Sequence, residues 1–187
     1  MDASLRTSLA AALTASLALF SGCGKVQESA AEKAAEKAIE AGMAKDGGKA
    51  KVDLSGGGMK IQTTDASGKT SQMEMGSAQV TEAELGVPFY PGTKPGEGQS
   101  TKISTPDGNA ITTAMHSDDA AEKVAEFFRQ KLKAQAEGKQ FTEMSGGGGN
   151  YTLMLADEKD KGFVQVHVNK ADKGSDIMIS AHRKVEK

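Results

Sequence analysis

The chain has no tryptophan, one cysteine and only 4% aromatic residues, while glycine numbers 22. Such a chain spends much of its length in turns and has little large apolar surface for a core. Its formal net charge is -2 and no block of Lys or Arg stands out, so the electrostatic footprint of a nucleic-acid-binding protein is missing. The apolar run from Leu9 to Phe20 is too short for a transmembrane helix, which needs ~20 such residues.

That apolar run leads into a cleavage signal. It is followed by the small pair Ser21-Gly22 and then by Cys23, the only cysteine in the protein. This order predicts a secretory signal peptide over residues 1–22. The stretch from Leu19 to Cys23 resembles a bacterial lipobox, which implies cleavage before Cys23 and attachment of diacylglycerol and a fatty acid such as palmitate to that residue, with no other cofactor. A plain secretory signal with a chance cysteine is the alternative, although a free thiol is a liability in an oxidising compartment.

The lipid would fix the location of the protein. Each buried methylene contributes about 0.8 kcal/mol, and two acyl chains suffice for stable membrane attachment. In lipoproteins of two-membrane bacteria, an Asp after the cysteine tends to retain the protein at the inner membrane, whereas this chain has Gly24. The resemblance therefore implies the outer membrane, with the protein facing the periplasm. In a host with one membrane, the same anchor implies the cell surface.

The segment from 23 to 48 is interpreted as the lipid anchor and a helical spacer. Residues 28–41 are dense in Ala, Glu and Lys, with no helix breaker before Gly42. Its apolar stripe is narrow and made of small side chains, which favours a solvated spacer about 25 Å long. A partner-binding coiled-coil arm is the alternative, but a coiled-coil seam needs larger apolar residues over several heptads.

Short strands are predicted next, over a β-meander and linker that span residues 49–84. The expected strands are 51–54, 59–64 and 70–75, separated by loops rich in Gly and Ser. Three strands with one apolar face are near the lower limit of independent stability, so we expect this meander to pack on something else.

Residues 85–187 are predicted to form an α+β domain. A hairpin of strands 102–105 and 110–116 precedes a helix that is expected to begin with Ser117 as its N-cap and to end near residue 137. Period-2 alternation then marks strands at 151–156, 163–168 and 176–181, with four further alternating residues at 140–143. The predicted fold class is α+β: a small β-meander followed by a ββαβββ unit with one helix packed on an antiparallel sheet.

The domain opens with Leu85-Gly86-Val87-Pro88-Phe89-Tyr90-Pro91-Gly92. Its prolines and glycines fix the backbone, while Val87, Phe89 and Tyr90 carry the largest apolar surface nearby. The segment could plug the edge of a core, and its three apolar residues are also a candidate partner surface. The lipobox, the Ala/Glu/Lys helix, the Gly-rich meander and this Val-Pro-x-Tyr-Pro-Gly motif together resemble a set of uncharacterised bacterial envelope lipoproteins. The resemblance implies the architecture but no activity.

Two groups of side chains are candidate metal sites. His116, His167 and His182 should not converge, because the hairpin register separates the latter two by several residues. Met59, Met73 and Met75 lie within one meander, and soft thioethers are the ligands that copper(I) prefers. Methionine also fills gaps in thin cores, so these residues are a weak alternative metal site.

No catalytic motif stands out. Gly146 to Gly149 is not followed by the Lys-Ser/Thr of a phosphate loop, and no nucleophile elbow is present. We therefore predict a non-enzymatic lipoprotein with no catalytic residue, anchored through Cys23 and acting as a binding or structural module in the cell envelope. Its partner would be an envelope protein or polymer rather than a nucleic acid. The alternative function is a Met-based copper(I)-binding or oxidant-buffering periplasmic lipoprotein.

Overall fold

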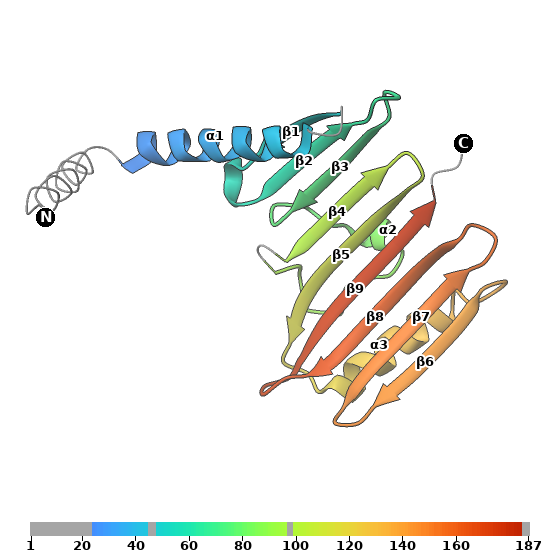
Figure 1. The fold of residues 1–187 in the computed structure, drawn as a ribbon. Coiled ribbons are helices and arrows are strands. Elements are labelled where there is room, and N and C mark those ends of the chain that lie inside the picture. The colour runs from blue at the N-terminus through green and yellow to red at the C-terminus, as the bar shows by residue number, and fades with distance from the viewer. Residues whose placement is uncertain (1–23, 45–47, 97–98, 185–187) are drawn as a thin grey trace, which may run out of the picture. The chain divides into compact units, whose positions relative to one another are not determined.

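The computed structural model describes residues 24–44, 48–96 and 99–184 (Figure 1). The chain divides into two compact units, Met1–Ala35 and Glu36–Lys187. Helix α1 (Gly24–Met43) crosses this boundary, and every strand described lies in the second unit. The predicted signal peptide at 1–22 and the lipidation site Cys23 lie outside the described residues. None of the described helices is long and apolar enough to cross a membrane.

The second unit is built on one antiparallel sheet with the strand order β1-β2-β3-β4-β5-β9-β8-β7-β6 among the residues described. The strands are β1 (Lys49–Asp53), β2 (Met59–Thr64), β3 (Thr70–Met75), β4 (Ser100–Thr105), β5 (Gly108–Ser117), β6 (Gln140–Gly146), β7 (Asn150–Asp157), β8 (Gly162–Lys170) and β9 (Ser175–Lys184). A short 3-10 helix, η2 (Ser55–Gly57), lies between β1 and β2. The molecule is thus of mixed class and mostly sheet.

The predicted meander and the predicted α+β unit share this sheet. Strand β3 pairs with β4 over four residue pairs, from Gln72↔Ser104 to Met75↔Thr101, so the meander continues directly into the next hairpin. The order predicted for the C-terminal part, ββαβββ, is wrong by one strand. The residues at 140–143 belong to β6, which pairs with β7 over seven residues and forms one edge of the sheet.

Helix α3 (Ala121–Lys133) begins later and ends earlier than predicted. Ser117 is the last residue of β5, and its Oγ accepts a hydrogen bond from the Asp119 amide at 3.1 Å. The Asp119 carbonyl accepts a hydrogen bond from the Ser175 hydroxyl at 3.0 Å. These contacts hold residues 118 and 119 in a turn, so the helix starts after Ala120, whose side chain provides no cap.

The core lies on one face of the sheet. Helix α3 packs on β7, β8 and β9, and Figure 1 shows it behind these strands. Buried side chains alternate along the strands, as in β9, where Ile177, Ile179 and Ala181 face the helix and the residues between them face away. The helix contributes Val124, Ala125, Phe128 and Leu132, all with 0% exposure. The wide sheet is therefore covered by one helix over its C-terminal strands only.

The segment before β4 completes the core. Helix α2 (Glu82–Leu85) begins with a capping box, in which the Thr81 hydroxyl accepts from the Glu84 amide and the Glu84 carboxylate accepts from the Thr81 amide. It ends at Gly86, whose φ of 74° places it in the left-handed region. The turn directs Leu85 and the residues after Gly86 into the core beside β9.

Helix α1 protects one edge of the sheet. The Glu40 carboxylate accepts a hydrogen bond from the Val52 amide at 2.8 Å, and the Glu36 carboxylate accepts one from the Leu54 amide at 2.9 Å. Val52 lies in β1 and Leu54 directly follows it, and among the described residues β1 has a partner strand on one side only. Bonding these two amides blocks the edge from pairing with another chain.

The β8–β9 turn packs closely on the backbone that follows β5, and this contact can be tested. A Cβ at Gly174 would overlap the Ser117 carbonyl oxygen and lie 2.8 Å from the Asp118 Cα, and its φ is 71°. Gly56 has a similar φ of 75°, but no heavy atom lies near its Cβ position. We expect Gly56→Ala to cost about 1 kcal/mol of unfolding free energy and Gly174→Ala about 3 kcal/mol or more. Urea denaturation measures both, and equal costs would show that the turn does not pack as described.

Candidate functional site

The expected partner surface at Val87, Phe89 and Tyr90 is wrong for two of its three residues. Val87 is 2% exposed and Tyr90 is 5% exposed, and both belong to the core, while Phe89 is half-buried against it. The Tyr90 ring meets the Phe127 ring edge-on, with centroids 5.2 Å apart. The motif therefore plugs the core, which was the other interpretation of its sequence.

A hydrogen bond anchors this plug at its polar end. The Tyr90 hydroxyl donates to the Asp119 carboxylate at 2.7 Å, and the Lys123 ammonium donates to the same carboxylate at 2.9 Å. Burial and this hydrogen bond raise the pKa of Tyr90, whereas the two donors lower the pKa of Asp119. The group is structural, because it ties the segment to the start of α3.

The three methionines of the meander are brought together. Met59 lies directly opposite Met75 on the neighbouring strand, and Met73 is two residues along β3 on the same face. All three are half-buried, and none belongs to the core cluster. They therefore lie outside the main core.

The three histidines are kept apart by the strand register. His167 lies opposite Met178, and His182 lies opposite Phe163, four residues further along β9. The His116 Nδ1 lies 2.8 Å from the Asp176 carboxylate at the end of β9. Among the described residues, no group of three or more His, Cys, Asp or Glu side chains is placed to hold a metal ion.

The face of the sheet opposite α3 is a surface that the sequence did not single out, and we call it the open face. Directly paired residues of neighbouring strands point to the same face, so the register defines its rows. The first row is Val52, Ile61, Met73, Ile103, Ala110, His182, Phe163, Ala156 and Gln140. The second is Met59, Met75, Thr101, Thr112, Ser180, Gln165, Met154 and Thr142. The third is Ala114, Met178, His167, Thr152 and Met144.

These three rows contain no Lys, Arg, Asp or Glu, although such residues make up 26% of the chain. They hold six of the nine methionines. The other face of β1 to β4 is different, because Lys51, Lys60, Glu74 and Lys102 lie on it. The absence of charge is thus particular to these three rows and not a property of the whole sheet.

The open face also carries exposed apolar side chains. Met144 is 61% exposed, Met178 is 39% exposed and Phe163 is 37% exposed. Depletion of charge with enrichment of Met is part of what distinguishes the core of a protein interface from the rest of a surface. Methionine suits such a surface because its flexible, polarisable side chain adapts to different partners. The open face is therefore the main candidate site.

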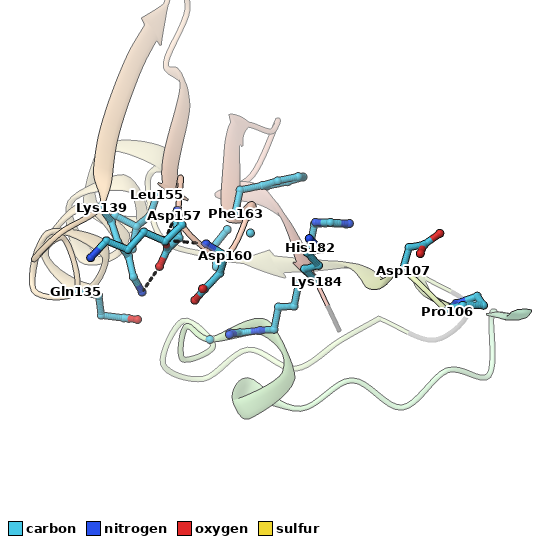
Figure 2. A pocket seen from close by; sticks show the side chains of 15 residues that line it. Pro106, Asp107, Gln135, Lys139, Leu155, Asp157, Asp160, Phe163, His182 and Lys184 are labelled. Carbon is cyan, nitrogen blue, oxygen red and sulfur yellow. Dashed lines mark hydrogen bonds and ion pairs between the residues drawn. The ribbon is translucent and has the colours of Figure 1, made fainter. Parts of the chain in front are cut away.

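A cleft of about 800 Å³ at one end of the sheet is the second candidate (Figure 2). The Phe163 and His182 rings stack on its wall, with centroids 5.8 Å apart, and the Lys139 ammonium lies 4.0 Å from the Asp157 carboxylate. Figure 2 shows Asp107 on the far side of the cleft from Lys139. Charges of both signs are spread along the rim and do not surround one point, so the cleft lacks the convergent polar groups of a typical small-molecule site.

If the open face is a docking surface, it should contribute little to folding. We expect Met178→Gln to change the free energy of unfolding by less than ~0.5 kcal/mol. The neighbouring residue Ile179 faces α3 and is 0% exposed, so Ile179→Ala should cost about 2–5 kcal/mol. Urea denaturation compares the two variants. A cost for Met178→Gln that approaches that of Ile179→Ala would show that the open face is covered in the folded monomer.

Comparisons of the chain with protein-family models, with curated proteins and with solved structures found no match. The sequence signals at the N-terminus and the geometry of the open face are therefore the basis on which a function can be proposed.

Proposed function

We propose that this protein is a bacterial lipoprotein, anchored through acylated Cys23, that acts as a non-enzymatic binding module in the cell envelope. The observation that carries the binding role is the open face, where three rows of paired residues lack charge and hold six methionines. An uncharged surface of this width costs little to desolvate, so a partner can cover it without burying an unpaired ion.

The anchored location is supported by the sequence. Ser21, Gly22 and Cys23 follow the apolar run at the position of a lipobox, and Gly24 favours export to the outer membrane. A lipid anchor would confine the module to a membrane surface, where its effective concentration toward other confined molecules is raised. A docking surface of moderate intrinsic affinity is sufficient in that setting. The partner we favour is an envelope protein, because an adaptable methionine surface suits apolar protein side chains better than a charged polymer.

The test uses the full chain with a photoreactive amino acid in intact cells. With the reactive group at Met178 on the open face, we expect a crosslinked adduct and recovery of the protein in the outer-membrane fraction. With the group at Gln72, which is exposed on the other face of the sheet, we expect no adduct. Replacement Cys23→Ala should release the protein from the membrane fraction and abolish labelling by fatty acid.

The two halves of the proposal fail separately in this experiment. An unlabelled, soluble protein that still carries Cys23 would contradict the anchor. An anchored protein that gives the same adducts from Met178 and Gln72, or none from either position, would contradict the docking role of the open face.

A second candidate function is supported by one further observation, the grouping of Met59, Met73 and Met75 on β2 and β3. Three flexible thioethers on adjacent strands can approach one soft cation such as copper(I), and they can also be oxidised to sulfoxides and so consume an oxidant. No charged residue lies among them on the three described rows of this face, which favours a cation of low charge. The protein would then bind copper(I) or buffer oxidants in the envelope.

Competition with a chromophoric copper(I) chelator under anaerobic conditions tests this function. We expect one equivalent of copper(I) to bind, and we expect Met73→Leu with Met75→Leu to abolish the binding while the fold is retained. The matched control is Met154→Leu with Met178→Leu, which removes two thioethers from distant strands of the same face. Equal binding by both double variants and the unchanged protein would exclude this site.

A further inference from the structure

The C-terminal half of the open face carries features of a surface that meets a copy of itself. It comprises the five strands β5, β9, β8, β7 and β6, with β9 second in the spatial order. The three exposed apolar residues of the open face, Met144, Phe163 and Met178, all lie on these strands. Self-association through this surface rests on the proposed docking role of the open face and names its partner as a second copy of the chain.

Strand β9 displays a symmetric arrangement of charge. Its residues on the open face are Asp176, Met178, Ser180, His182 and Lys184, of which the first holds the only carboxylate and the last the only ammonium group. Asp176 and Lys184 have opposite signs and lie four residues to either side of Ser180. A two-fold axis that passes beside Ser180, in the plane between two stacked sheets and perpendicular to β9, would place each Asp176 over the Lys184 of the second copy.

The same axis also determines how the three rows between Asp176 and Lys184 lie on those of the second copy. It places the row of Met178 over the row of His182, so Met178 of each copy meets the His182 ring of the other, and His167 meets Phe163. The row of Ser180 lies over itself. In an isologous interface each patch must be complementary to itself. The three rows meet this requirement for charge, because they lack Lys, Arg, Asp and Glu and so bring no like charges of these types together.

The area is that of a stable interface. Five strands spaced ~4.8 Å apart span about 24 Å, and the eight residue steps from Asp176 to Lys184 span about 27 Å. The covered surface is then roughly 650 Å² on each copy, or about 1,300 Å² in total, which is within the range of specific complexes. Two twisted sheets that pack face to face align at about 30°, so a patch of five strands is a realistic size for the contact.

We propose that the protein forms a two-fold dimer in which the open faces of strands β5 to β9 pack against each other about an axis beside Ser180. Each copy pairs its Asp176 with the Lys184 of the other. Strands β2 and β3, with their three methionines, lie outside the contact and stay free for another ligand. Acylated Cys23 on both chains would hold the dimer at one membrane surface.

The test places a photoreactive amino acid at Phe163 of the full chain and co-expresses two differently tagged copies. We expect a crosslinked species that carries both tags. Charge reversal then tests the axis: Asp176→Lys alone or Lys184→Glu alone puts two pairs of like charges in the dimer, and should lower the crosslinked fraction roughly threefold to tenfold. In the mixed dimer of the two single variants both contacts again join opposite charges, so on co-expression the fraction that carries both tags should rise above that of either variant by itself.

Each other outcome contradicts the dimer in a recognisable way. Adducts from Phe163 that contain another protein and never both tags would overturn the dimer and leave the binding role intact. The absence of any adduct from Phe163 and Met178 would overturn both proposals. If the fraction that carries both tags is the same in the charge-reversal variants as in the unchanged protein, or does not rise when the two variants are co-expressed, the arrangement about Ser180 is overturned.

Discussion

The coverage of a nine-stranded sheet by one helix of 13 residues is the constraint on which the rest of the structure depends. A helix of that length is about 20 Å long, and its main packing is on β7, β8 and β9. The core therefore forms on one face over the C-terminal strands, and α2 with the Val-Pro-Phe-Tyr-Pro segment fills the remaining space beside β9. On the opposite face Val52 of β1 is buried, whereas Met144, Phe163 and Met178 on the C-terminal strands are exposed, so the composition of that half of the face must be explained by something other than internal packing.

The two edges of the sheet are treated differently. At β1, the carboxylates of Glu36 and Glu40 accept hydrogen bonds from strand amides, which makes that edge unsuitable for another strand. At β6, the Arg129 guanidinium binds the Glu143 carboxylate and so ties the strand to α3 through its side chains. This pairing lowers the pKa of Glu143 and keeps it ionised, and a charge pair on the strand disfavours association along the edge. Face-to-face docking is then the more favourable mode of association for this sheet.

The sequence predicted the individual elements well and their assembly poorly. Strands 59–64 and 70–75 have the predicted bounds, because Gly-rich loops flank strong alternation. The helix start at Ser117 was wrong because the Asp119 carbonyl is bonded to Ser175, a contact across 56 residues that no local pattern reveals. For the same reason the junction of β3 and β4 could not be foreseen. The open face was missed, although it was visible in principle: alternate positions of β5, β7 and β8 lack Lys, Arg, Asp and Glu, and this is apparent only once the faces are aligned by register.

The choice of methionine explains how the open face can exist before it is covered. A face of Leu and Ile at the same positions would be as apolar, but more rigid and prone to unspecific aggregation. On the open face the thioethers of the methionines can repack, and the neighbouring threonine, glutamine and histidine side chains keep the rows hydrated. Thr112 and Ser180 share a hydrogen bond at 3.1 Å, and Thr152 and His167 share one at 3.0 Å, so these four polar groups of the face satisfy one another across strands. These four groups keep their partners when the face is covered, so their desolvation takes little from the gain of burying Met144, Met178 and Phe163. The same arrangement that keeps the uncovered face hydrated thus lowers the free-energy cost of covering it.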